Sequence, residues 1–427
     1  MKTDHLILYR FTKDGLAYNF SRLLQMCTDN SVLEEKDIIS NREMLLSCVN
    51  GLVEIASSHG FYGNIWHCYL TYLLVSKENA YSLGCEIKED EGGSVSQIAY
   101  LDFSIYKSLF DFDLSVLEES FGVDVSFLSH FEDKNTDGKV FNHRIRDCIL
   151  DLCEALEHAE DVASFQKEVA LFYKHFGVGT MGLHKAFRLN DNGEIIPIQK
   201  IPHINFSDLI GYEDQKQRLC ENTLAFVSGK PSNNVLLYGD AGTGKSSSIK
   251  ATINAFYDDG LRMIEVYKHQ FRYLNQIIDQ VKNRNYKFII YMDDLSFEEF
   301  EVDYKYLKAV IEGGLEKKPD NVLIYATSNR RHLIRESFND KKDMDDMHKN
   351  DTVQEKLSLY HRFGVTIYYG SPNKSEFMDI VLGLKNRYHL DMDEETFLLE
   401  ANRWELKHGG YSGRAAQQFI DYLLGKE

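Results

Sequence analysis

The sequence predicts a mixed α/β fold, in which a mostly helical N-terminal domain precedes a parallel sheet covered by helices and a small C-terminal helical subdomain. Three observations predict it. The first part of the chain has apolar residues at helical spacing. The second part alternates β-rich apolar runs with helical patterns, which is typical of βαβ units. The glycine-rich segment GDAGTGKSS lies directly after the first of those runs.

The mostly helical N-terminal domain is expected over residues 1–187. Its clearest helical patterns lie at 42–60, 64–84 and 142–177, and each ends at a glycine, a residue that often follows the last turn of a helix. The next segment, 188–205, contains two of the five prolines of the chain. We therefore expect an inter-domain linker there.

The α/β core is expected over residues 206–371 and a helical subdomain over 372–427. Apolar, β-rich runs supply five expected strands, at 234–239, 262–267, 287–294, 321–329 and 365–370. Because parallel strands are joined by helical crossovers, we expect helices on both faces of the sheet. Beyond the last run only helical patterns remain, so helices close the chain.

The composition is that of a soluble globular protein, with 43% hydrophobic and 27% charged residues. We find no run of eighteen or more apolar residues and no signal-peptide pattern, so no membrane partner is expected. Seven cysteines, an odd number without a CxxC pair, favour reduced thiols over a disulfide framework. These features predict a cytoplasmic protein.

The charge is acidic and unevenly spread. The net charge is −18, and the first 200 residues hold 18 Lys and Arg against 31 Asp and Glu. An acidic surface is a poor electrostatic match for nucleic acid, although a local basic patch is compatible with this balance. The charge therefore favours a protein partner over nucleic acid.

The segment GDAGTGKSS matches the phosphate-binding pattern GxxxxGK[ST] in full, between an expected strand and an expected helix. Its glycines allow backbone N–H groups to wrap a phosphate, and the helix N-terminus adds its positive end. We expect Lys245 to reach the β- and γ-phosphates and the Ser246 hydroxyl to bind magnesium. The predicted nucleotide-binding residues of this loop are Gly239, Asp240, Ala241, Gly242, Thr243, Gly244, Lys245, Ser246 and Ser247.

Two adjacent aspartates, Asp293 and Asp294, end the expected strand KFIIYMDD. In P-loop folds the strand beside the P-loop strand presents an Asp to the magnesium shell, so Asp293 is the expected metal ligand. The alternative is a helix N-cap, a position that Asp also favours.

Further polar side chains follow the later strands. Asn329, in YATSNRR, could hold the attacking water or the γ-phosphate, or could simply form a turn. Arg362, in YHRFG, could reach a neighbour's nucleotide at a subunit edge, where an arginine stabilises the transferring phosphoryl group. Arg330 and Arg331 compete for that role, and a surface arginine is the plain alternative. Arg414, in GGYSGRAAQQ, could sense the γ-phosphate of its own chain or be a solvated helix residue.

Taken together, these motifs make residues 205–427 resemble an AAA+ ATPase module. GDAGTGKS resembles its Walker A motif, FIIYMDD its Walker B motif, ATSN its first sensor, HRFG its arginine finger and SGRAA its second sensor. The segment FSDLIGYEDQK resembles the box that packs on adenine, which implies that Ile210, Gly211 and Tyr212 lie near the base. More narrowly, YMDDLSFEE, ATSNRRHLI, KLSLYHRFG and SGRAAQQF are similar to the bacterial P-loop family catalogued as domain of unknown function 815.

The resemblance implies a five-stranded parallel sheet of order 5-1-4-3-2 with a C-terminal helical lid. It implies ATP or ADP with Mg²⁺ as ligands, and a homo-oligomer formed through the AAA+ module. The implied roles are phosphate and metal binding for Lys245 and Ser246, magnesium binding for Asp293, water positioning for Asn329, action in trans for Arg362 and action in cis for Arg414.

Two functions are compatible with these residues. The first is an ATPase that hydrolyses ATP at subunit interfaces and remodels a protein client held by the N-terminal domain. The second is a nucleotide-gated switch or adaptor, similar to a loader, with little hydrolysis.

One departure from the AAA+ pattern bears on this choice between functions. Walker B commonly ends Asp-Glu, whereas this chain has Asp-Asp. Asp294 is the expected catalytic base, but its side chain is one methylene shorter than Glu; the alternatives are Glu298 and a site without a competent base.

Overall fold

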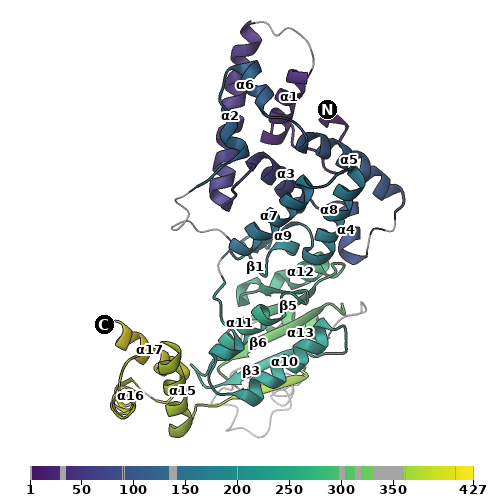
Figure 1. Cartoon of the computed structure of the whole chain (residues 1–427). Coiled ribbons are helices and arrows are strands. Elements are labelled where there is room, and N and C mark those ends of the chain that lie inside the picture. Colours follow the sequence, from purple (N-terminus) through teal and green to yellow (C-terminus); the bar gives the residue numbers. More distant parts are fainter. Residues whose placement is uncertain are drawn as a thin grey trace. The chain divides into compact units, whose positions relative to one another are not determined.

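The computed structural model describes residues 2–28, 35–88, 90, 92–133, 142–199, 201–297, 303–312, 319–330, 360, 362–408 and 410–426. The chain divides into two compact units, Met1–His184 and Lys185–Glu427. The helices and strands of the whole chain are shown in Figure 1. Each unit has its own buried core.

Unit 1 is built from helices. They are η1 (Thr3–His5), α1 (Leu16–Thr28), α2 (Glu35–His59), α3 (Ile65–Ser76), α4 (Ala80–Ile87), α5 (Ser94–Phe110), α6 (Ser115–Phe121), η2 (Ser126–Ser129), α7 (His143–Glu157), α8 (Val162–Phe176) and α9 (Gly179–Leu183). Among the residues described in this unit, the one strand-like pairing is an isolated bridge between Gly63 and Phe131. The N-terminal region is therefore helical.

The N-termini of several of these helices are capped by side chains. The side chains of Asn64, Asn79, Asn142 and Asp161 accept hydrogen bonds from backbone N–H groups in the first turns of α3, α4, α7 and α8. Such caps satisfy donors that the helix itself cannot satisfy. The helices pack around a shared aromatic core that includes Phe20, Trp66 and Phe103.

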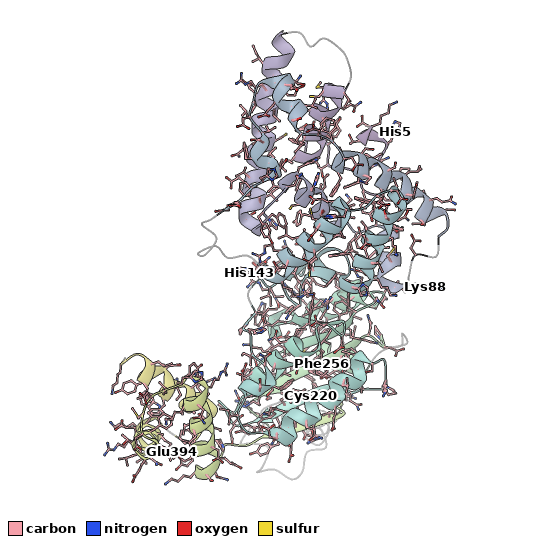
Figure 2. The ribbon with its side chains drawn as sticks, viewed as in Figure 1. His5, Lys88, His143, Cys220, Phe256 and Glu394 are labelled. Atoms are coloured by element: carbon pink, nitrogen blue, oxygen red, sulfur yellow. The ribbon has the colours of Figure 1, made fainter. Side chains whose placement is uncertain are left out.

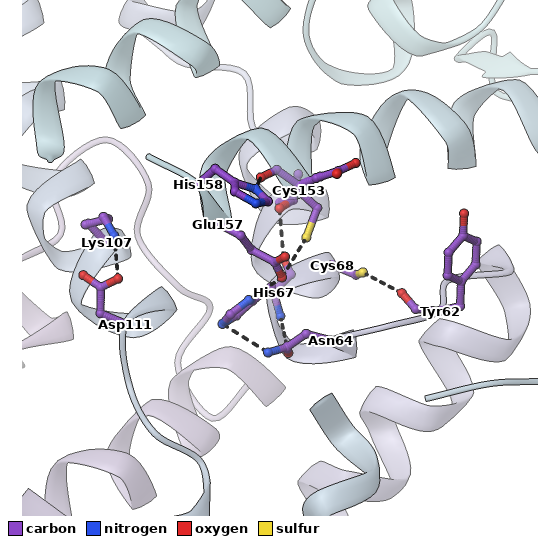
Figure 3. A network of polar contacts seen from close by, with 11 residues as sticks. Tyr62, Asn64, His67, Cys68, Lys107, Asp111, Cys153, Glu157 and His158 are labelled. Atoms are coloured by element: carbon purple, nitrogen blue, oxygen red, sulfur yellow. Dashed lines mark hydrogen bonds and ion pairs between the residues drawn. The ribbon is translucent and has the colours of Figure 1, made fainter. Parts of the chain in front are cut away.

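A polar network links α3 to α7 inside unit 1 (Figure 3). His67 Nδ1 lies 2.6 Å from Glu157 Oε1, and the His67 ring stacks on Phe110 with centroids 4.5 Å apart. The Cys153 thiol also lies against Glu157, and the Cys68 thiol donates to the carbonyl of Tyr62. The network gives the half-buried His67 ring a carboxylate partner at the surface of unit 1.

Among the described residues of unit 2, one sheet of seven strands is formed. They are β1 (Ala186–Leu189), β2 (Ile195–Pro197), β3 (Val235–Gly239), β4 (Leu261–Glu265), β5 (Lys287–Met292), β6 (Val322–Ser328) and β7 (Val365–Tyr369). Their order is β2-β1-β4-β5-β6-β3-β7, and every pair is parallel except β1 with β2.

The expectation of a five-stranded, wholly parallel sheet is wrong. The five expected strands lie next to one another, as β4-β5-β6-β3-β7, but β1 and β2 extend the sheet beyond β4. β1 spans the boundary at residue 188 between the expected N-terminal domain and the segment expected to be a linker, 188–205, and β2 lies within that segment. β1 pairs Phe187 with Ile264 of β4, a long-range contact that a local pattern cannot reveal.

Both faces of the sheet are buried. The helices of the sheet region are η4 (Phe206–Asp208), α10 (Glu213–Val227), α11 (Lys245–Phe256), η5 (Lys268–Tyr273), α12 (Leu274–Val281) and α13 (Asp303–Glu312). Leu219 of α10 and Ile249 of α11 pack on alternate strand residues such as Leu237. Intervening strand residues such as Leu236 and Ile290 are buried too. Cys220 and Phe256, labelled in Figure 2, mark α10 and α11.

Three helices close the chain: α15 (Lys374–Arg387), α16 (Glu394–His408) and α17 (Gly413–Leu424). They form a small core of their own, to which Phe377, Phe397 and Phe419 contribute. No helix among the described residues is long and apolar enough to span a bilayer.

The strand order creates a natural ligand site. After β3 the chain runs towards one edge of the sheet to form β4. After β6 it runs towards the opposite edge to form β7. Ligands of open α/β sheets bind where such connections diverge, beyond the carboxyl ends of the strands. Here that point lies between β3 and β6.

Candidate functional site

A cavity of about 790 Å³ lies in unit 2 at this point. It is lined by the loop and first turn after β3, by the residues that follow β5, by the end of β6 and by the C-terminal helices. The predicted residues that line it are Ile210, Gly211, Tyr212, Ala241, Gly242, Thr243, Gly244, Lys245, Ser246, Ser247, Asp293, Asp294, Asn329 and Arg414. Most of the residues singled out from the sequence are thus brought to one place.

The other predicted residues lie elsewhere. Gly239 and Asp240 do not line the cavity, because the Asp240 N–H donates to the Tyr369 carbonyl and ties this end of the loop to β7. Neither Arg362 nor Arg330 lines the cavity of its own chain. Arg331 and Glu298 lie outside the described residues.

The loop after β3 leads into a helix start without a cap. Gly244, with φ of 91°, is the N-cap of α11 and has no side chain to accept from the first N–H groups of the helix. These groups have no carbonyl ahead of them within the helix. They therefore stand at the cavity as donors, together with the positive end of the helix dipole.

Lys245 is buried beneath the loop. Its Nζ donates to the carbonyl oxygens of Gly239 (3.0 Å) and Asp240 (2.6 Å). Because an ammonium has three N–H groups, one more can be donated to a ligand. Burial lowers the pKa of Lys245, while the carboxylates of Asp240, Asp294 and Asp293 act in the opposite direction.

Asp293 is held by two hydroxyl groups. Ser246 Oγ donates to Asp293 Oδ1 at 2.7 Å, and Thr327 Oγ1 donates to the same oxygen at 2.6 Å. Burial opposes ionisation of Asp293, but these hydrogen bonds outweigh it and keep the pKa of its carboxyl below the usual value. The side chain is therefore a carboxylate at neutral pH.

The hydroxyl of Ser246 and the carboxylate of Asp293 fit a magnesium ion. Mg²⁺ prefers oxygen ligands and commonly takes one or two protein side chains, water and substrate phosphates. No group of three His, Cys, Asp or Glu side chains able to hold a metal is found in the part of the chain that the structure describes. A metal at this cavity would thus depend on phosphate oxygens for further ligands.

Asp294 has an unusual backbone conformation. Its φ is 49°, in the left-handed region that Asp adopts more readily than most residues. Its N–H donates to Thr327 Oγ1 at 2.9 Å, and its Oδ1 accepts from Asn329 Nδ2 at 2.8 Å. Main chain and side chain are thus both held by the end of β6.

The start of α17 lies against the loop that carries the predicted phosphate-binding pattern, residues 239–247, which is called the P-loop below. Arg414 donates its backbone N–H to the Gly242 carbonyl at 3.1 Å, and the Ser412 side chain caps the helix by accepting from Ala415. A side chain at Gly242 would come within 3.1 Å of Arg414 Cβ, so a glycine permits this close approach. Arg414 is in this way anchored at the cavity by its main chain.

The other end of the cavity is apolar. Ile210 packs against Gly383 of α15, where a Cβ would lie 2.5 Å from the end of the Ile210 side chain. The Tyr212 ring stacks on Tyr369 with centroids 5.2 Å apart, and its hydroxyl donates to the Gly370 carbonyl. These contacts build a wall suited to a flat, apolar group.

An ion pair closes this apolar end. Arg387 of α15 lies 3.2 Å from an oxygen of Asp208, and it also donates to the Asp208 carbonyl. Both residues line the cavity. The pair therefore connects the C-terminal helices to the segment before α10.

Several lining residues were not expected from the sequence. They include Thr327, Asp208, Ile380, Leu384, Arg387, Tyr388 and Gln417. Thr327 lies two residues before Asn329 near the end of β6, where β-branched residues are common, so the sequence did not distinguish it. The residues of α15 follow a helical spacing that is equally typical of an ordinary helix core.

A comparison of the sequence with models of known protein families gives a match over residues 182–427. They match the model of a family described as a protein of unknown function (DUF815). The chain belongs to this family. The matched region includes the whole of the cavity lining. No curated protein matches the chain.

Proposed function

We propose that residues 206–427 are an ATP-binding module of the AAA+ type, which hydrolyses ATP to remodel or move a protein partner held by unit 1. The observation on which this rests is the convergence, in one cavity, of an uncapped helix start, Lys245 and the Ser246–Asp293 pair. An anionic, metal-bound chain such as a triphosphate matches these donors and ligands.

The opposite, apolar end of the cavity would take the base and sugar. A volume of about 790 Å³ is within the range of small-molecule sites, which is about 300–1,000 Å³. Ile210, Ile380 and Leu384 supply apolar contact surface there. When bound, Mg²⁺ would neutralise part of the charge on the phosphates.

Hydrolysis would use the two residues beyond the metal pair. A water oxygen attacks the γ-phosphorus, the bond from that phosphorus to the bridging oxygen of ADP breaks, and the water proton passes to the Asp294 carboxylate. Asn329, within 2.8 Å of Asp294, can orient the water or the base. Arg414, anchored at the P-loop, can stabilise charge on the γ-phosphoryl group.

Assembly would complete the site. Arg362 does not line the cavity of its own chain, which agrees with a role at the cavity of a neighbouring copy. An arginine supplied in trans raises the hydrolysis rate by about 10³-fold or more in related phosphoryl-transfer enzymes. We therefore propose a homo-oligomer whose ATPase activity is slow in isolated chains.

A nucleotide-gated switch is the second candidate. One observation favours it: the Asp294 side chain, one methylene shorter than Glu, is held towards Asn329, and a carboxylate placed short of the attacking water activates it poorly. A base held in this way would hydrolyse ATP slowly, and ATP would then act by fixing one conformation.

One experiment separates the two proposals. The ATPase rate is measured against protein concentration for the wild-type chain, Arg362→Ala and Asp294→Asn. Arg403→Ala is the matched control, because Arg403 is exposed on α16 and pairs with Glu400.

The motor predicts a specific rate that rises with concentration. It also predicts a fall of about a hundredfold or more in Asp294→Asn, the usual contribution of a general base, and a large fall in Arg362→Ala. A rate near background in a wild-type chain that binds ATP and changes its oligomer size contradicts the motor and supports the switch.

A further inference from the structure

Thr327 holds three consecutive residues beyond the end of β5. Its hydroxyl donates to Asp293 Oδ1 at 2.6 Å and accepts from the Asp294 N–H at 2.9 Å. Its carbonyl accepts from the Leu295 N–H at 2.7 Å. One residue thus fixes a side chain and two backbone groups of the neighbouring strand's end.

The sheet register explains this arrangement. The last paired residues of the two strands are Met292 and Ala326, so Thr327 stands where the ladder would continue opposite Asp293. The chain turns away at Asp294 instead, with its φ of 49°. The Thr327 hydroxyl takes the place of a ladder carbonyl as acceptor for the Asp294 N–H. The turn is therefore maintained by a side chain.

This turn decides where the Asp294 carboxylate points. An aspartate has a short side chain, so the position of its carboxylate depends mainly on the backbone. Thr327 is buried, with 1% exposure, and its two partners hold its hydroxyl in one orientation. Asn329 then fixes the carboxylate itself.

The Thr327 hydroxyl also couples Asp293 to Asp294, because it forms a hydrogen bond with each of them. Its oxygen accepts from the main chain of Asp294 and its hydrogen bonds the carboxylate of Asp293, so a displacement of either acid is transmitted to the other. Residues that orient metal ligands and bases in this way affect metal affinity or activity by about 10–100-fold.

We propose that Thr327 is a positioning residue of the ATPase reaction, which sets the metal-binding carboxylate of Asp293 and the base carboxylate of Asp294 at a fixed mutual geometry. This inference rests on the proposed function. The threonine would in this way compensate for an Asp in the place that commonly holds a Glu.

Two substitutions test the hydroxyl. Thr327→Val removes it while keeping the shape of the side chain, and Thr327→Ser keeps it. Thr252→Val is the control: Thr252 is equally buried, and its hydroxyl bonds only the Ser248 carbonyl inside α11 among the described residues. For each chain, we would measure thermal unfolding, kcat and KM for Mg-ATP, and the Mg²⁺ concentration that gives half-maximal binding of a fluorescent ATP analogue.

Thr327→Val is expected to lower kcat by about 10–100-fold with KM changed by less than about threefold, because a displaced base affects the chemical step more than binding. Its Mg²⁺ midpoint is expected to rise about tenfold. Thr327→Ser is expected to stay within about threefold of wild type in both. Thr252→Val is expected to lose thermal stability alone.

The outcomes distinguish this inference from the proposed function. A Val variant with wild-type kcat and Mg²⁺ midpoint overturns the inference, and so does a Ser variant that falls as far as Val. If the wild-type chain binds Mg-ATP without hydrolysing it, only the proposed ATPase motor is contradicted. The role of Thr327 is then tested by comparing the Mg²⁺ midpoint of Thr327→Val with that of wild type. A wild-type chain that binds no nucleotide overturns both.

Discussion

Gly239, at the start of the P-loop, and Gly383, behind Ile210, both stand where a side chain would collide with a neighbour, and they lie next to opposite ends of the cavity without lining it. A Cβ at Gly239 would lie 2.1 Å from the Tyr369 carbonyl oxygen, which belongs to the backbone of β7. A Cβ at Gly383 would lie 2.5 Å from Cδ1 of Ile210, the movable end of a side chain. The P-loop end is therefore bounded by main chain, and the apolar end by side chains.

This difference has a functional consequence. Main-chain groups paired in a sheet cannot shift without breaking hydrogen bonds, so the P-loop end can hold charged ligand groups at fixed positions. Side chains can change rotamer at little cost, so the apolar end can adapt to what it binds. We expect binding energy and precise placement to come mainly from the P-loop end.

The largest effect is expected for Gly239→Ala. Its φ of 133° is strained for any residue with a Cβ, and the clash with Tyr369 would push β3 away from β7. We expect a loss of about 3 kcal/mol or more in the free energy of unfolding, measured by denaturant or thermal melting.

The control for this variant is Gly84→Ala. Gly84 lies inside α4, and a Cβ added there would meet no heavy atom within 4 Å, so alanine should be neutral or stabilising. Equal melting temperatures for Gly239→Ala and wild type would contradict a rigid P-loop end.

Lys245→Ala is expected to have the next largest effect. A charge-assisted hydrogen bond contributes about 1.5–3 kcal/mol, so the Kd for Mg-ATP should rise about 10–100-fold. Isothermal titration calorimetry measures it, with Lys374→Ala, an exposed lysine at the start of α15, as the control.

The melting temperature of Lys245→Ala is measured as well, to show whether the variant is folded. Nζ of Lys245 bonds two loop carbonyls, so a modest fall in stability is expected too. An unchanged Kd in a folded Lys245→Ala variant would mean that the ligand does not reach the P-loop.

Gly383→Ala should have the smallest effect. The helix gains up to about 1 kcal/mol from an alanine, and Ile210 can rotate away, so we expect little change in melting temperature. The displaced Ile210 narrows the apolar end, and the Kd for ATP should rise only a few-fold. The same titration measures it. A loss of ATP binding as large as that of Lys245→Ala would reverse the proposed ranking of the two ends.

The sequence predicted the P-loop end better than the apolar end for a physical reason. A phosphate site needs glycines, a lysine and a hydroxyl at fixed spacing along one segment, so Gly244, Lys245 and Ser246 form a local pattern. The apolar end is assembled from α15 and the segment before α10, far apart in the chain. Ile380 and Leu384 are ordinary apolar residues there, and no spacing distinguishes them from a helix core.

Strands β1 and β2 and the contacts of Thr327 were not predicted from the sequence, and the reasons are related. β1 and β2 are short and pair with each other, and β1 joins them to the sheet by pairing with β4, which is distant in the sequence. Thr327 is a β-branched residue near the end of a strand, where such residues are common. Its importance comes from the neighbouring strand, since its partners Asp293 and Asp294 follow β5.

The most direct test of the account is to measure ATP binding to the 427-residue chain by calorimetry. The titration is done once in the presence of Mg²⁺ and once with the metal chelated. We predict saturable binding of one nucleotide per chain that weakens when Mg²⁺ is removed, because Ser246 and Asp293 form a magnesium-type ligand pair. The absence of saturable binding to the folded chain would contradict the assignment of this cavity to ATP.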